Sequence, residues 1–232
     1  MQTLQITLFG SPTIRLDTQS LTQQINIKAQ ALLYYLVTTR RTHYRTELAS
    51  LFWPDMPDVQ ARKNLRNILP VLRHVVSNHI VVTRHTVMFN PYTPYWLDIE
   101  AFQTLLGRDS SRTSTTAIWE ALALYTDDFL TGFYVRNAPL FESWMLLERD
   151  RLRDMACDAL QSLATRHLQE SDYQMALNAT KRLISMEPWR ESAHRQQMQA
   201  LVGLGQRGSA MAQYEICQRI LDDEFGVEPE DE

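Results

Sequence analysis

Five basic and amide side chains recur at helical spacing within the first half of the chain: Arg62, Lys63, Arg66, Asn67 and Arg73. At about 100° per residue, positions 62, 66 and 73 form one stripe along a helix, with 63 and 67 beside it. Guanidinium and amide groups make paired hydrogen bonds to guanine and adenine edges, whereas the Lys63 ammonium suits a phosphate. The pattern predicts a helix face that binds nucleic acid. The alternative is a solvated basic face without a partner.

The helix that carries these residues is predicted over Val59 to about Val76, because its apolar residues repeat at intervals of three and four. They are Ala61, Leu65, Ile68, Leu69, Leu72 and Val75. Asp58 is its expected N-cap. A short helix from Glu47 to Phe52 precedes it, with Thr46 as the expected N-cap, and must end near Pro54. In a pair of helices joined by a tight turn, the later helix can enter the major groove of DNA.

Pro70 lies inside the longer helix. Proline removes a backbone donor and clashes with the preceding turn, at a cost of about 3 kcal/mol in a regular helix. We therefore expect the helix to kink or to shift its register near Pro70. Arg73 would then point in a different direction from Arg62 and Arg66.

Two short runs of β-forming residues follow, Ile80 to Thr83 and Thr86 to Phe89, and they predict a hairpin with Arg84 and His85 at its tip. Such a tip would reach the adjacent minor groove or the DNA backbone, although a hairpin tip is also an ordinary place for polar residues. Arg45 and Thr46, at the start of the short helix, are further candidates for phosphate contacts.

The N-terminal residues complete a small α+β unit of about 100 residues. Alternating apolar residues predict a hairpin with strands at Leu4 to Leu8 and Ile14 to Leu16, joined by a Gly-Ser-Pro turn. A third strand is predicted at Ile25 to Ile27, followed by a helix from Lys28 to Val37. The order of these elements predicts an α+β winged helix-turn-helix domain over residues 1–105.

Residues 106–115 are rich in Gly, Ser, Thr and charge, and are predicted to form a linker. Residues 116–232 have helical periodicity almost throughout. Ala176 and Ala210 lie 34 positions apart, each shortly after a polar turn between two helices, and 34 residues is the period of tetratricopeptide helix pairs. The second domain is therefore predicted to be an all-α tetratricopeptide-like helical repeat domain. Stacked helix pairs leave a concave surface suited to a peptide, a partner domain or a small ligand.

The net charge of −4 conceals two halves of opposite sign. Residues 1–104 carry ten Lys and Arg against six Asp and Glu, which gives +4; the remaining residues carry 13 against 21, which gives −8. The basic half is the expected place for phosphate contacts. The acidic half should be repelled by DNA, so we expect removal of residues 113–232 to leave DNA affinity equal or greater.

The sequence argues against several classes of protein. It has 44% hydrophobic and 22% charged residues, no apolar run long enough to span a membrane and no signal peptide, so a cytoplasmic globular protein is expected. It contains none of the common phosphate-loop, dinucleotide, zinc-protease or serine-hydrolase motifs, and its histidines lack metal-ligand spacing. Cys157 and Cys217 suggest neither a disulfide framework nor a zinc cluster. We expect no enzymatic activity, no metal and no cofactor.

Several motifs resemble, in the family's order, those of the SARP-type bacterial transcriptional activators. The winged-helix domain of that family is similar to the stretch KAQALLYYLVTTRRTHYRTELASLFWPDMPDVQARKNLRNILPVLRHVV, with its successive elements LASLFWPD, ARKNLRNIL and LR. The bacterial transcriptional activator domain that follows it in the family is similar to ALALYTDDFLTGF, WMLLERDRLR and LDDEFGVEP. The resemblance spans nearly the whole chain, which makes it more specific than any single motif.

The resemblance implies an OmpR-like winged helix that binds direct repeats in double-stranded promoter DNA, joined to a tetratricopeptide-like domain, with RNA polymerase recruited to activate transcription. It assigns DNA contacts to the five residues of the longer helix, and to Arg84 and His85 as the wing. The loop from Trp53 to Asp58 corresponds to a segment that would face polymerase, with the sigma subunit as the expected partner. Asp55 and Asp58 are the contact candidates, with helix capping as the alternative, whereas Trp53 is expected to close the small core.

The resemblance also implies a protein of the bacterial cytoplasm that associates with the nucleoid when bound, and it leaves a homodimer on DNA open. Related members often continue into a nucleotide-hydrolysing or sensor domain, so a chain that stops soon after GVEPEDE leaves open that it is a fragment. The main alternative is a protein-interaction scaffold, in which the helical repeats bind partners and the winged helix does not read DNA.

Overall fold

The structure is a computed structural model that describes residues 3–107 and 113–230. It divides into two compact units. Unit 1 comprises Met1–Thr104 and Ala123–Leu152, and unit 2 comprises Leu105–Leu122 and Arg153–Glu232. This division differs from the predicted domain boundaries, because residues 123–152 pack in unit 1 and not with the later helices. Part of the predicted linker, residues 108–112, lies outside the described residues.

Unit 1 begins with the predicted hairpin. Strand β1 (Leu4–Thr7) pairs antiparallel with β2 (Thr13–Leu16), and Ile6 faces Ile14 in this register. The alternation of apolar and polar residues buries Leu4, Ile6 and Ile14 on one face of the sheet. Strand β3 (Gln19–Ser20) pairs with β2, and β7 (Tyr95–Leu97) runs parallel to β1, which gives the order β3-β2-β1-β7.

The predicted strand at Ile25 to Ile27 is wrong. Residues Thr22–Gln24 form a turn of 3-10 helix, and the Asn26 side chain accepts a hydrogen bond from the Ala29 backbone N–H at 2.9 Å. Asn26 is therefore the N-cap of α1 (Ile27–Thr39). An Asn directly before a helix-forming run is a strong capping signal, and it outweighs the short apolar alternation around it.

The predicted helix-turn-helix pair is formed by α2 (Arg45–Phe52) and α3 (Asp58–Val76). Both predicted caps lie inside their helices, because the N-cap of α2 is Tyr44, two residues before Thr46, and that of α3 is Pro57, one residue before Asp58. The Glu47 carboxylate accepts a hydrogen bond from the Tyr44 backbone N–H at 3.2 Å, which satisfies a donor at the start of α2.

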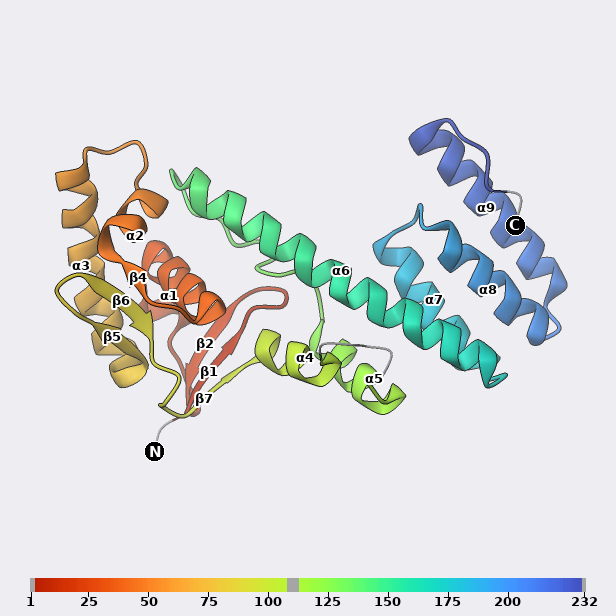
Figure 1. Ribbon diagram of the computed structural model, residues 1–232, viewed down its shortest axis with the longest axis horizontal. Coiled ribbons are helices and arrows are strands. Elements are labelled where there is room, and N and C mark those ends of the chain that lie inside the picture. Colours follow the sequence, from red (N-terminus) through yellow and green to blue (C-terminus); the bar gives the residue numbers. More distant parts are fainter. Residues whose placement is uncertain (1–2, 108–112, 231–232) are drawn as a thin grey trace. The chain divides into compact units, whose positions relative to one another are not determined.

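The predicted wing follows α3 after a 3-10 turn at Ser77–His79. It consists of β5 (Ile80–Val82) and β6 (Thr86–Phe89), which pair antiparallel next to α3 in Figure 1. A strand without a predicted counterpart, β4 (His43–Tyr44), joins the start of α2 to β6, so the second sheet has the order β4-β6-β5. The wing is thereby attached to the helix-turn-helix pair by a backbone ladder.

The start of α4 (Asp98–Leu106) is tied to the end of β1. Asp98 is 3% exposed, and its carboxylate accepts hydrogen bonds from the backbone N–H groups of Leu8 at 2.7 Å and Phe9 at 2.9 Å. Burial raises the pKa of Asp98, although these N–H donors oppose the shift. Neither α4 nor β7 is among the elements predicted from the sequence.

Residues 123–152 pack onto the rest of unit 1 through aromatic rings. The Phe133 ring centroid lies 5.2 Å from that of Tyr34 in α1, and the Phe141 centroid lies 5.2 Å from that of Phe52 in α2. Phe129 is fully buried in the same unit. Removal of residues 113–232 would take these rings out of the core, which argues against the expectation that the remaining residues would bind DNA equally well or better.

Unit 2 is built from helices. They are α5 (Thr115–Leu124), the later part of α6 (Pro139–Gln169), α7 (Tyr173–Met186), α8 (Glu191–Gly203) and α9 (Arg207–Phe225), of which α7, α8 and α9 pack in succession (Figure 1). The two alanines of the predicted repeat, Ala176 in α7 and Ala210 in α9, are both buried. The chain is therefore an α+β winged helix-turn-helix followed by an all-helical repeat region, as the sequence predicts.

Candidate nucleic-acid interface

The predicted recognition face lies on the exposed side of α3. Its five polar residues, Arg62, Lys63, Arg66, Asn67 and Arg73, are all exposed. The opposite side of α3 is buried through Ala61, Leu65, Ile68, Leu69, Leu72 and Val76. Burial of this apolar stripe holds the helix against unit 1, and so directs the polar side chains outward.

A hollow of about 440 Å³ lies between α3, the start of α2 and the wing tip, and we call it the wing hollow. It is lined by Tyr44, Arg45, Thr46, Arg62, Leu65, Arg66, Arg84 and His85. Six of the nine predicted DNA-binding residues therefore meet at one place, although they come from three elements and lie up to 40 positions apart in the chain. Tyr44 has no counterpart among the predictions; its position directly before Arg45 is the signal that could have identified it.

A second hollow of about 420 Å³, which we call the Arg73 hollow, lies further along α3. It is lined by Arg45, Arg66, Leu69, Pro70, Arg73, His74 and Val82. The helix continues through Pro70 to Val76, and Arg66 and Arg73 line the same hollow, so the expected turning of Arg73 away from Arg66 is not observed. Leu72 and Val76, both fully buried, hold the last turns of the helix in place.

Arg45 joins the two hollows and also ties α2 to the wing. Its backbone N–H donates to the His85 carbonyl at 2.9 Å, and its Nη1 donates to the Arg84 carbonyl at 3.4 Å. Because 39 positions separate Arg45 from Arg84, sequence spacing could not have revealed this contact. Arg45 therefore has a positioning role in addition to its predicted phosphate contact.

Lys63 and Asn67 are exposed on α3 but line neither hollow. Their roles in DNA binding stay predictions from helical spacing. His74 lines the Arg73 hollow and lies seven residues, or about two helical turns, after Asn67. This spacing could have identified His74 as a residue of the same helix face.

The loop between α2 and α3 is fixed by Trp53 and Lys28. Trp53 is 7% exposed, and the Lys28 ammonium lies 4.8 Å from the centroid of its ring. The same ammonium donates to the Phe52 carbonyl at 2.8 Å, at the carboxyl end of α2, where a positive charge is favourable. Burial lowers the pKa of Lys28. These contacts give Trp53 a structural role, as expected.

Asp55 and Asp58 lie exposed beside this loop. The Asp58 carboxylate is 4.0 Å from the guanidinium of Arg62, whose Nε donates to the Asp58 carbonyl at 3.2 Å. Asp58 is the first residue of α3 and directly follows the N-cap residue, Pro57. Both carboxylates are accessible, and a contact with polymerase stays a prediction for each.

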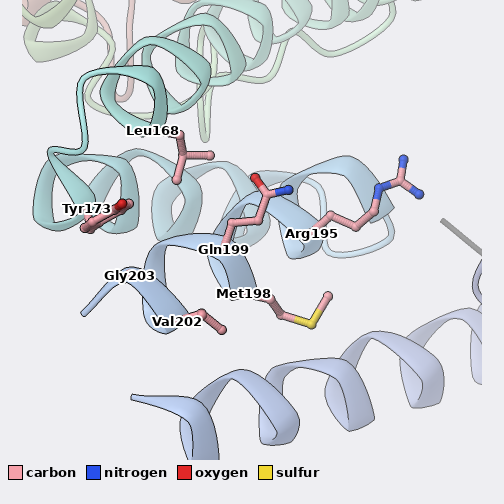
Figure 2. Close-up of a pocket in the computed structure, with 7 residues that line it drawn as sticks. All are labelled: Leu168, Tyr173, Arg195, Met198, Gln199, Val202 and Gly203. Atoms are coloured by element: carbon pink, nitrogen blue, oxygen red, sulfur yellow. The ribbon is translucent and has the colours of Figure 1, made fainter. Parts of the chain in front are cut away.

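Unit 2 carries a groove of about 560 Å³ along α8 (Figure 2). It is lined by Leu168, Tyr173, Arg195, Met198, Gln199, Val202 and Gly203. Gly203 is required here, because a Cβ at this position would lie 2.5 Å from carbons of the Tyr173 ring. Most of the lining is apolar, with a guanidinium at the Arg195 end, and such a surface can take a peptide or a small ligand.

Within residues 3–107 and 113–230, no three His, Cys, Asp or Glu side chains are grouped so that they could hold a metal ion. Across the same part of the chain, no helix is long and apolar enough to cross a membrane.

Comparison with known proteins identifies a family and a similar fold. The family model of the bacterial transcriptional activator domain matches residues 97–232. The fold is similar to that of Mycobacterium tuberculosis EmbR, solved in complex with a low-affinity phosphopeptide, with a TM-score of 0.74 and 16% sequence identity. That alignment covers 100% of this chain and 63% of the EmbR chain, so this chain spans less than two thirds of the length of its structural relative. A search of curated proteins found no match. The family match and the shared fold confirm the resemblance to SARP-type activators.

Proposed function

Because the chain belongs to the bacterial transcriptional activator domain family and is thus a transcriptional regulator, we propose that it activates transcription by binding promoter DNA through α3 and the wing. The observation that carries this proposal is the wing hollow, where four arginines, a histidine and a threonine from three elements converge on the exposed side of the helix-turn-helix pair.

The chemistry of this surface suits a DNA duplex. Arginine and lysine side chains that neutralise phosphates release counterions and supply most of the affinity. Arg62, Arg66 and Asn67 would lie in the major groove and choose the sequence through base edges, as guanidinium and amide groups can. The protein would act as a regulator without catalytic activity, metal or cofactor, in the bacterial cytoplasm where the chromosome lies.

The operator and the transcription machinery form the finer part of the proposal. The family resemblance favours direct repeats in the promoter, each occupied by one copy of the chain, so that a homodimer would form on the DNA. RNA polymerase would be recruited through contacts that include the exposed carboxylates of Asp55 and Asp58, with the sigma subunit as the expected partner.

A gel-shift titration with promoter fragments tests DNA binding directly. At about 150 mM salt, the full chain should form a discrete complex that persists with excess non-specific DNA. Arg66→Ala should weaken this complex by about 1–3 kcal/mol, or roughly 5- to 150-fold, because one base contact is lost. The matched control is Arg207→Ala, which removes an exposed arginine from α9 and should leave affinity unchanged.

The groove on α8 favours the second candidate function, a protein-interaction scaffold. A scaffold would keep its partners when Arg66 is replaced and would form no discrete complex with any promoter fragment. The absence of a specific complex for the unaltered chain would therefore contradict DNA reading and leave the scaffold as the better account.

A further inference from the structure

The wing is a short hairpin whose turn is restrained by hydrogen bonds. Val82 pairs with Val87, and the Thr83 backbone N–H donates to the Thr86 carbonyl at 2.9 Å, which leaves Arg84 and His85 as the two residues of the turn. The Thr83 hydroxyl oxygen accepts hydrogen bonds from the backbone N–H of His85 at 3.2 Å and of Thr86 at 2.9 Å. The turn therefore has few conformations available to it.

The tip is also held against the start of α2. Besides the two hydrogen bonds from Arg45 to the carbonyls of Arg84 and His85, Tyr44 of β4 pairs with Thr86 of β6. A wing that reads the minor groove has to extend a side chain into a groove about 6 Å wide, beside the one that α3 occupies. Here the tip is bonded to the helix pair instead, and both of its side chains line the same hollow as Arg62 and Arg66.

The lining of the wing hollow matches a sugar-phosphate segment. Its cations are guanidinium groups, its other polar groups are the His85 imidazole and the hydroxyls of Tyr44 and Thr46, and its described lining includes no carboxylate. The buried Leu65 gives the hollow an apolar floor. A phosphodiester would neutralise the clustered cations, while its deoxyribose would cover the apolar floor.

We propose that the wing hollow clamps one segment of the DNA backbone, so that Arg84 and His85 contact phosphates and do not read base edges in the minor groove. This inference rests on the proposed DNA-binding function and specifies how the wing takes part in it. The wing would then add affinity and fix the position of α3 on the duplex, and the choice of sequence would belong to α3 alone.

The test uses the full chain and the duplex site recovered with it. Single phosphates are replaced, one at a time, by neutral methylphosphonates, and affinities are measured for the unaltered chain, Arg84→Ala and Arg15→Ala. Arg15 is an exposed arginine of β2 that lines neither hollow, so its replacement matches the change in charge. A second set of duplexes carries 2,6-diaminopurine in place of adenine beside the α3 site, which adds an amino group in the minor groove and leaves the major-groove edge unchanged.

We expect one or two methylphosphonates to weaken binding of the unaltered chain about tenfold, the scale of a hydrogen bond to a charged group. Arg84→Ala should bind unmodified DNA about tenfold more weakly than the unaltered chain does. Methylphosphonates at those one or two positions should weaken its binding by no more than about twofold further. The slope of the logarithm of its affinity against the logarithm of the salt concentration should be smaller by about 0.9. Arg15→Ala should respond to the modified phosphates as the unaltered chain does. Diaminopurine should affect none of the three proteins.

Two results would overturn the clamp. One is a diaminopurine substitution that weakens the unaltered chain but not Arg84→Ala, since this pattern means that Arg84 reads the minor groove. The other is an Arg84→Ala protein that stays fully sensitive to every modified phosphate. Failure of the unaltered chain to bind any duplex specifically is a different outcome, because it contradicts the proposed function itself.

Discussion

Asp98 is a buried carboxylate whose role is structural. Its three hydrogen bonds, from the backbone N–H groups of Leu8, Phe9 and Ile99, join strand β1 to helix α4 across about 90 positions of the chain. Buried backbone donors without an acceptor cost free energy, so this single side chain stabilises the junction.

Asp98→Ala should lower the free energy of unfolding by about 1–3 kcal/mol for each backbone donor left unpaired. Urea unfolding followed by circular dichroism measures this loss. Asp55→Ala, which removes an exposed carboxylate from the same unit, serves as the control and should change stability by less than about 0.5 kcal/mol.

The effect of Asp98 should also depend on pH. Burial raises its pKa in the folded protein above that of the unfolded chain, so the folded state binds a proton that the unfolded state has released. The stability that Asp98 contributes is therefore fully present below the unfolded pKa, and falls as the pH rises through the folded pKa. The stability gap between the unaltered chain and Asp98→Ala should widen from pH 7 to pH 4; a gap that narrows on acidification would contradict this assignment.

At the scale of elements, α3 combines a functional face with an internal proline. The helix runs from Asp58 to Val76 and keeps Arg66 and Arg73 on one hollow, although Pro70 lacks the N–H that would bond to the Arg66 carbonyl. Pro70 is exposed, and the buried residues on either side of it hold the helix together.

Pro70→Ala should make the protein more stable by about 1–3 kcal/mol. Replacing proline removes its penalty within a helix, roughly 3 kcal/mol. Part of this gain is offset because proline also stabilises the fold by restricting the unfolded chain, and Ala restricts it less. Thermal unfolding measures the change, and a lower midpoint would show that Pro70 has an unrecognised packing role. DNA affinity should stay within about twofold, because Arg66 and Arg73 would keep their positions.

The regular elements could be predicted where local periodicity is strong. The α3 helix, the β1–β2 hairpin and the wing were predictable because their apolar residues repeat at intervals of three and four, or of two. Strand β7 and helix α4 were not, because β7 has only three residues and pairs with β1 some 90 positions away, and because α4 starts at an Asp whose partners are remote. Two-residue β4 carries no periodicity at all.

The residues of the candidate site could be predicted from the sequence, but their convergence on one hollow could not. Residue type and helical spacing pointed to Arg62 and Arg66, and the hairpin pattern pointed to Arg84 and His85. That these residues line one hollow depends on the contact between Arg45 and the wing tip, which no local pattern encodes.

At the scale of the whole molecule, the compact units do not follow the order of the chain. Residues 123–152 belong to the part of the sequence matched by the activator-domain family, yet their aromatic rings complete the core of unit 1. Composition could not reveal this arrangement, because aromatic residues in a helical stretch pack equally well against helices of their own domain.

Truncation should therefore have different effects at residues 112 and 152. A chain ending at 112 loses the rings of Phe129, Phe133 and Phe141, and removal of one such ring costs about 3–5 kcal/mol against a total stability of about 5–15 kcal/mol. It should lose cooperative unfolding, measured by thermal melts in near-ultraviolet circular dichroism. A chain ending at 152 should retain a cooperative transition, and equal behaviour of the two fragments would contradict this account of unit 1.

The central claim, that α3 reads promoter DNA, is tested most directly by recovering bound DNA from the whole genome with the full chain and with Arg66→Ala. The account predicts discrete promoter fragments that share a sequence repeated in one orientation, with enrichment lost in Arg66→Ala. A recovery without discrete sites, or the same sites with undiminished enrichment in Arg66→Ala, would contradict it.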